Sequence, residues 1–149
     1  MNFRAQATTS INTAVLREKL RVAVQLSVEQ SCELIADEAR SICPVDTGEL
    51  RDSIVVVPPV VEGSTVVGGV AATAGHAAFV EFGTGLRGMG TYPGPLPQEG
   101  VPFTGSWVYD YKHQKWVGHA SQSFMRPAVD AARDRIKGIF VSNVKMAVK

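Results

Sequence analysis

The chain has 149 residues, of which 45% are hydrophobic and 19% are charged, and its formal net charge is +1. This composition excludes a disordered chain, and the length fits one domain with a modest core. No apolar run is long enough to span a bilayer, and residues 1–10 lack the apolar stretch of a signal peptide, so we expect a protein that folds in a cytoplasm.

The net charge hides an uneven distribution along the chain. Residues 29–52 carry seven acidic and two basic groups, whereas residues 112–149 carry eight basic and two acidic groups. A chain of this kind can pair its acidic part with its own basic part, or with that of a second copy stacked head-to-tail. The alternative is that these are solvated helix faces that differ by chance.

The first predicted element is a long helix over residues 12–42. No Gly or Pro interrupts it, and Pro44 ends it because proline disfavours helical geometry in the preceding residue. On such a helix Cys32 and Cys43 would lie about 16 Å apart, which predicts two core thiols rather than a disulfide. The apolar stripe consists of Leu16, Leu20, Val24, Val28, Cys32, Ile35, Ala39 and Ile42.

A short helical turn is predicted over residues 47–52. Asp46 and Glu49 have the spacing of an N-cap residue and its capping-box partner. Thr47 supports this cap, and Gly48 relieves crowding beside it.

Two strands follow in "SIVVVPPVV" and "TVVGGVAA", joined by a turn at residues 62–64. Pro58 and Pro59 cannot lie within a central strand, so they indicate a bulge or an edge. Residues 77–82 are compatible with a short helix that has Gly83 as its C-cap, or with a strand, because so few residues do not settle the period.

Residues 85–105 are rich in Gly and Pro and predict a long loop with little regular structure, and residues 1–11 are expected to be flexible. Alternation on both sides of "KHQ" then predicts a hairpin, with Trp107, Tyr109 and Trp116 available for packing. A last helix is predicted from about Pro127, with the stripe Val129, Ala132, Ile136, Phe140 and Val144. These elements predict an α+β fold, in which residues 1–149 form one domain and the last helix packs on a small antiparallel sheet.

The Asp-Thr-Gly triplet at residues 46–48 occurs in retroviral-type aspartic proteases. In those enzymes the aspartate follows an apolar strand and shares a proton with a second carboxylate. Here the triplet follows the end of a helix, and Glu49, Arg51 and Asp52 would disturb that proton sharing. We therefore do not expect a protease.

Other chemistry has little support in the sequence. A metal site would need His76, His113 and His119 to meet a carboxylate such as Glu81, which nothing in the pattern requires, so we expect no metal and no cofactor. The basic groups of the last helix are interleaved with Asp130 and Asp134. A solvated helix face is therefore favoured over a nucleic-acid-binding module, and direct DNA contact is not favoured.

Three stretches together resemble one family: "CPVDTGELRDSI", "HAAFVEFGTG" and "SFMRPAVDAA". They are similar to the tail-completion (head–tail joining, or neck) proteins of long-tailed bacteriophages, the gene-ten-like tail-component family of HK97-type phages. That family shows a proline before Asp-Thr-Gly-x-Leu-Arg-x-Ser, then aromatic-Glu-aromatic-Gly-Thr, then Arg-Pro-Ala at the start of the last helix. The resemblance extends from residue 12 over nearly the whole chain.

The resemblance implies a structural virion protein and no catalysis. It implies a homo-oligomeric ring at the head–tail junction, assembled in the host cytoplasm. Its partners would be a head-completion or connector protein and a tail terminator or tail tube protein, with no membrane. A tail terminator or a minor capsid component are neighbouring alternatives, and a nucleic-acid-binding module is an alternative of another class.

The motifs that carry the resemblance supply the candidate site residues. An ion pair between Arg51 and Glu81 is a hypothesis based on their positions in two of these motifs. The loop after Gly83 is a candidate for contact with a partner. The structural motif residues are Asp46, Thr47, Gly48, Leu50, Arg51, Ser53, Glu81, Phe82, Gly83, Thr84, Phe124, Arg126 and Pro127, and the candidate contact residues are Leu86, Arg87, Tyr92, Phe103, Trp107, Tyr109 and Trp116.

Overall fold

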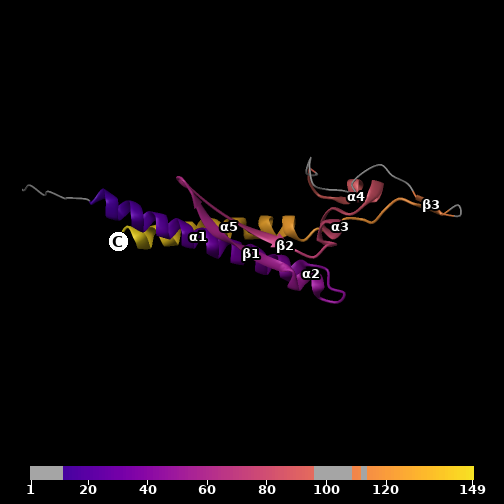
Figure 1. The fold of residues 1–149 in the computed structure, drawn as a ribbon, viewed down its shortest axis with the longest axis horizontal. Helices are drawn as coiled ribbons and strands as arrows, with labels where there is room; N and C mark the ends of the chain where they lie inside the picture. Colours follow the sequence, from indigo (N-terminus) through magenta and orange to yellow (C-terminus); the bar gives the residue numbers. More distant parts are fainter. Residues whose placement is uncertain (1–11, 96–108, 112–113) are drawn as a thin grey trace, which may run out of the picture.

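The computed structural model describes residues 12–95, 109–111 and 114–149. It is an elongated α+β fold in which two long helices lie side by side (Figure 1). The predicted fold class is thereby confirmed. In chain order the elements are α1 (Thr13–Ile42), α2 (Glu49–Asp52), β1 (Ile54–Glu62), β2 (Thr65–Ala72), α3 (Ala77–Phe82), α4 (Gly85–Thr91), β3 (Tyr109–Tyr111), β4 (Gln114–Trp116) and α5 (Met125–Ala147).

Helix α1 has the predicted limits. The side-chain oxygen of Asn12 accepts hydrogen bonds from the amides of Ala14 and Val15, both at 3.2 Å, and so caps the first turn. At the other end the amide of Cys43 still donates to the carbonyl of Ala39, and the chain then turns away at Pro44.

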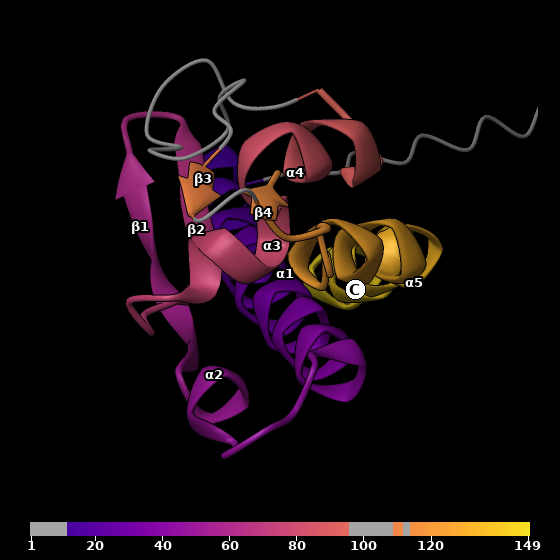
Figure 2. The ribbon, with the colours of Figure 1, turned by 90° about the vertical axis from the view of Figure 1, so that its right-hand side faces the viewer.

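Helix α1 is covered on two sides. Figure 2 shows it between the β1–β2 hairpin and α5, and it contacts all three elements. The predicted stripe of larger side chains is mostly half-buried, although Ile42 is 44% exposed. The α1 residues with less than 9% exposure are all small: Ala23, Ser27, Ser31, Cys32, Ala36 and Ala39. Small side chains allow a second element to approach the helix closely.

Helix α5 runs antiparallel to α1, and a polar cluster lies between them. The amide group of Asn143 donates to the hydroxyl of Ser27 at 3.1 Å and to the side chain of Gln30 at 2.9 Å, while Ser27 donates to the carbonyl of Ala23. Asn143 and Ser27 are both buried, so these bonds offset the cost of removing them from water. An ion pair between Glu38 and Arg135 lies further along the same interface.

The predicted stripe of α5 needs one correction. Ala132 is fully buried, and Ile136, Phe140 and Val144 are half-buried, but Val129 is 43% exposed. The helix presents Ala128 and Ala132 to the core in its first turns, which turns Val129 toward the surface.

Strands β1 and β2 form the predicted antiparallel hairpin, with its turn at Gly63 and Ser64. The register shifts between Val57 and Val60, so Pro58 and Pro59 lie in a bulge as predicted. Ile54 of β1 is 1% exposed and packs in the core beside Ala36, Leu50, Phe124 and Ala128. The first turns of α5 thus pack against the end of the hairpin.

The prediction of a loop over residues 85–105 is wrong at its start, because Gly85–Thr91 form helix α4. Besides the hydrogen bonds within α4, the amides of Thr84 and Arg87 donate to the carbonyls of His119 and Val117. These long-range bonds stabilise α4, and the local sequence does not reveal them. The predicted second hairpin is confirmed as the pair β3–β4, with Tyr109 opposite Trp116. Phe103, Trp107 and residues 1–11 lie outside the described residues.

Both cysteines are free and buried, as predicted. Burial raises the pKa of the Cys32 thiol, and the charge of Glu33 acts in the same direction. Burial also raises the pKa of Cys43, against an opposing effect of Arg51. Both thiols therefore stay protonated at neutral pH and serve as core groups. In the described part of the chain, no helix is both long enough and apolar enough to cross a membrane.

A substitution at Gly68 would test the contact between the hairpin and α1. A Cβ atom at this position would lie 2.7 Å from Cγ1 of Val28 and 3.2 Å from Sγ of Cys32. We expect Gly68→Ala to lower the free energy of unfolding by about 1–3 kcal/mol, measured by urea denaturation, because it overpacks this interface. At Gly69 the nearest atom is 3.8 Å away, so Gly69→Ala is the matched control and should leave stability within about 0.5 kcal/mol. Equal effects of the two substitutions would contradict the close approach of Gly68 to α1.

Candidate functional site

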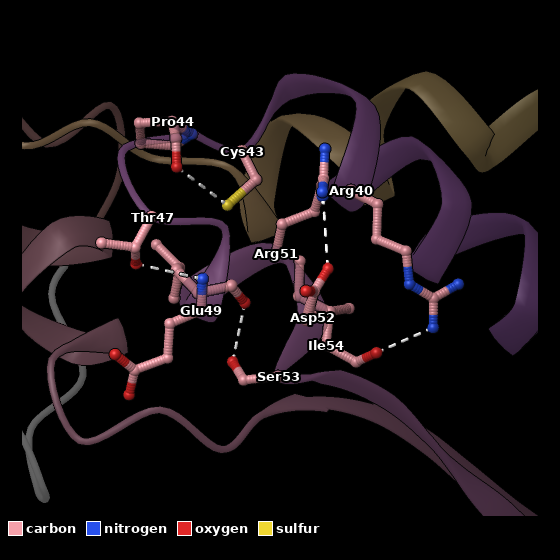
Figure 3. A network of polar contacts seen from close by, with 10 residues as sticks. Arg40, Cys43, Pro44, Thr47, Glu49, Arg51, Asp52, Ser53 and Ile54 are labelled. Carbon is pink, nitrogen blue, oxygen red and sulfur yellow. Dashed lines mark hydrogen bonds and ion pairs between the residues drawn. The ribbon is translucent and has the colours of Figure 1, made fainter.

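The Asp-Thr-Gly segment connects α1 to the hairpin through α2 (Figure 3). The predicted cap by Asp46 is wrong: the N-cap position is Gly48, with φ of 92°, and Asp46 is exposed two residues before it. The amide of Glu49 instead donates to the hydroxyl of Thr47 at 3.3 Å. Asp46 is too far upstream to cap because the left-handed Gly48 delays the start of the helix.

The end of this segment is tied to the sheet. The Ser53 hydroxyl donates to the carbonyl of Leu50 at 2.7 Å, and the Ser53 carbonyl accepts from the amide and hydroxyl of Thr73. Arg40 of α1 donates to the carbonyl of Ile54 at 2.7 Å, as Figure 3 shows. Leu50 is buried in the core. The motif therefore fixes the angle at which the chain leaves α1 and enters β1.

The hypothesis of an ion pair between Arg51 and Glu81 is wrong. The guanidinium of Arg51 lies 3.4 Å from the carboxylate of Asp52, its neighbour in the chain. Both side chains are about half or more exposed, so this pair contributes little to stability. The carboxylate of Glu81 has other partners.

Glu81 is only 6% exposed, and its carboxylate caps the first turn of α5. One oxygen accepts from the amides of Phe124 at 2.7 Å and Met125 at 3.0 Å, and the other accepts from the amide of Arg126 at 3.3 Å. The N-terminus of a helix carries unpaired amides and a partial positive charge, and both favour a carboxylate. Helix α3 therefore holds the start of a helix that lies more than 40 residues later in the chain.

Residues 117–122 form a strap across α3 and α4. The amide of Thr84 donates to the carbonyl of His119 at 3.0 Å, and the amide of His119 donates to the Thr84 hydroxyl at 2.9 Å. Ser121 donates through its hydroxyl to the carbonyl of Glu81 at 2.6 Å and through its amide to the hydroxyl of Thr91. Thr91 and Ser121 were not predicted, since neither belongs to a recognisable local pattern.

Gly83 is needed where the strap crosses. Its φ is 71°, and a Cβ atom there would lie 2.6–2.7 Å from the backbone of Gly88, His119 and Ser121. No side chain fits at that distance, so the Gly-Thr step after α3 is set by the close approach of three backbone segments.

Phe124 is fully buried, and Pro127 is the third residue of α5, within its first turn as predicted. The ring of Phe82 lies 5.0 Å from that of Tyr92 in an edge-to-face contact, so Tyr92 packs within the chain. Leu50, Ala77 and Phe124 belong to one core cluster. The three motifs, distant in sequence, thus meet around a common core.

The family model described as "Bacteriophage HK97-gp10, putative tail-component" matches residues 5–83, which is more than half of the 149 residues. The chain belongs to this family. The match contains the Asp-Thr-Gly motif and α3 with Glu81, and it ends at Gly83. The Arg-Pro-Ala motif lies beyond it, yet Glu81 binds the amides at that motif directly. No curated protein and no solved structure matches the chain.

A surface cavity of about 600 Å³ lies beside the Glu81 cap in this tail-component protein. Both oxygens of Glu81 accept amide hydrogens, so this carboxylate is engaged in holding α5. No group of three or more potential metal ligands occurs among the described residues. The residues that line the cavity are Ala72, Ala77, Ala78, Glu81, Phe82, Tyr92, Phe124, Met125, Arg126, Val129, Asp130 and Arg133.

Among the residues predicted to contact a partner, Leu86 and Arg87 on α4 are exposed, with Leu86 at 44%. For Tyr109 and Trp116 the structure describes the backbone pairing across β3 and β4. Contact of α4 with a neighbouring tail protein stays a prediction.

Glu81→Ala should strongly destabilise this tail-component protein. It would leave three amides at the start of α5 without their acceptor, one of them buried and two partly buried, so we expect the free energy of unfolding to fall by about 2–4 kcal/mol. Glu81→Gln keeps an acceptor oxygen but loses the charge, and should cost about 1–2 kcal/mol. Urea denaturation measures both, and hydrogen exchange at the Met125 amide reports the cap directly.

Glu49→Ala is the matched control, because Glu49 is an exposed glutamate in the first turn of α2. Its substitution should change stability by no more than about 0.5 kcal/mol. If Glu81→Ala were as mild as Glu49→Ala, the cap would not hold α5 as described.

Proposed function

We propose that this chain is a structural assembly protein of a long-tailed phage that forms a ring of identical copies at the head–tail junction. The observation that carries the proposal is the family match over residues 5–83, which makes the chain a phage tail component. A head-completion or connector protein would lie on one side of the ring, and a tail terminator or tail tube protein on the other.

The surface of the fold supports a role in protein assembly. Val55, Val57, Val60 and Val67 form an apolar face on the side of the hairpin away from α1, and each is 41–58% exposed. In cross-strand register this face continues through Ala71 and Gly69, opposite Val55 and Val57. Contiguous exposed apolar surface of this kind marks contact with other proteins.

The nucleic-acid-binding alternative receives less support. On α5, Arg133 lies 2.9 Å from Asp130, and Lys137 lies 3.3 Å from Asp134. Arg135 pairs with Glu38 of α1. Acidic neighbours reduce the attraction of this helix for a phosphate backbone. Tail terminator and minor capsid roles remain alternatives within phage assembly, and particle composition separates them from a junction protein.

Deletion of the gene for this chain in the phage that encodes it should yield separate filled heads and free tails in electron micrographs. Complementation with the intact chain should restore joined particles, and mass spectrometry of purified particles should detect the chain. The Glu49→Ala variant, which should keep its stability, is expected to restore joined particles as the intact chain does. Joined, infectious particles without the chain would overturn the proposal, and its presence only in isolated heads would favour a minor capsid role.

A further inference from the structure

Helix α1 has an outer face that is turned away from its contacts within the chain. Its residues recur every three or four positions and all are exposed: Val22, Leu26, Glu29, Glu33 and Asp37. Val22 is 52% exposed and Leu26 is 41% exposed. The face is therefore apolar in its first half and acidic in its second half. We call it the α1 outer face.

Helix α5 has a corresponding outer face on the side opposite its buried residues. It consists of Arg133, Lys137, Val141, Lys145 and Val148, the last directly after the helix end, and all are exposed. Val141 is 52% exposed and Val148 is 56% exposed. The two basic groups Arg133 and Lys137 come first, and the two valines follow toward the C-terminus with Lys145 between them. We call it the α5 outer face.

The two faces match in length, and at both of their ends in residue type, when the helices run antiparallel. Each extends over fifteen residue steps, about 22 Å at the rise of an α-helix. Antiparallel alignment brings Asp37 opposite Arg133, Glu33 opposite Lys137 and Val22 opposite Val148. It also brings Glu29 opposite Val141, the one position where an acidic group meets an apolar side chain. The aliphatic stem of Lys145 then lies along Leu26, with its ammonium group near Glu29.

The same two helices already pack antiparallel within one chain, with Ser27 beside Asn143 and Glu38 beside Arg135. The alignment of the outer faces has nearly the same offset along the chain as these contacts. Because α5 turns its outer face away from its own α1, the match requires a second copy.

We propose that the α1 outer face of one copy binds the α5 outer face of the next copy. The contact joins two different surfaces, so a growing assembly keeps one free α1 outer face at one end and one free α5 outer face at the other until it closes. This inference deepens the proposed function. The pairing of the two faces is argued from their charged and apolar residues, whereas closure into a ring rests on the proposed function at the head–tail junction.

Existing ion pairs do not prevent this contact. Asp37 pairs with Arg40, Arg133 with Asp130, and Lys137 with Asp134, all within one helix. The side chains of Asp37, Arg133 and Lys137 are 66–73% exposed, and ion pairs of exposed groups contribute little in water. Burial of Val22, Leu26, Val141 and Val148 supplies the apolar part of the contact, while the charges select the antiparallel register.

Disulfide trapping between separate chains tests the contact. Glu33→Cys is made in one preparation and Lys137→Cys in another, and the two are mixed under oxidising conditions at high protein concentration. We expect a mixed disulfide dimer, because these positions face each other across the contact. The control mixture pairs Glu33→Cys with Glu62→Cys, since Glu62 is exposed at the hairpin turn. The native cysteines are buried and do not compete.

Charge reversal supplies a second test, in which analytical ultracentrifugation measures self-association of the wild type and of the charge variants. Glu33→Lys alone and Lys137→Glu alone should each weaken self-association about tenfold or more, because each places like charges opposite one another. A mixture of the two variants should associate like the wild type, since each restores the missing charge of the other. Glu62→Lys should have no such effect.

Trapping no stronger than in the control mixture, or failure of the two charge variants to rescue each other where the wild type associates, would overturn the inference. These outcomes are separable from failure of the proposed function. If the contact is trapped but particles join without the chain, the interface stands and the junction role falls. If particles need the chain but no trapping occurs, the junction role stands and this interface falls.

Discussion

The carboxylate of Glu81 lies inside the protein, and the first turn of α5 makes that position tolerable. A buried carboxylate without partners would be strongly unfavourable. Here three amides of residues 124–126 donate to it, and the helix directs its positive end at the same oxygens. The amides are stabilised in turn by the carboxylate, because they have no other acceptor within the helix. One side chain thus decides where α5 begins and how α3 lies against it.

The position of α5 along α1 depends on this cap by Glu81. With the start of α5 held beside the hairpin end, the helix runs back along α1, and Asn143 reaches Ser27 and Gln30 near its far end. Small buried side chains on α1 make room for this approach. Helix α1 consequently serves as the central element, with the hairpin on one side and α5 on the other (Figure 2). The buried polar cluster fixes the position of α5 along α1, since a shift by one turn would leave Asn143 unpaired.

Local signals in the sequence predicted the elements well. Pro44 and the unbroken apolar spacing defined α1, and the paired prolines of β1 indicated its bulge. Contacts between distant segments could not be predicted in this way. The capping role of Glu81 depends on amides more than 40 residues later, and α4 depends on the strap over residues 117–122. Asp46 failed as a cap for a different reason, because the pattern of a capping box does not reveal a left-handed glycine between its two members.

The bulge in β1 has a consequence for the way in which one copy of this fold can meet another. A two-stranded sheet leaves both of its strands with an open edge, and open edges tend to pair with those of other molecules. Pro58 and Pro59 have no amide hydrogen to offer, and the bulge interrupts the regular spacing of the donors and acceptors around them. Pairing of two hairpins edge to edge along β1 is thereby hindered, which favours contacts made by side chains over contacts made by backbone.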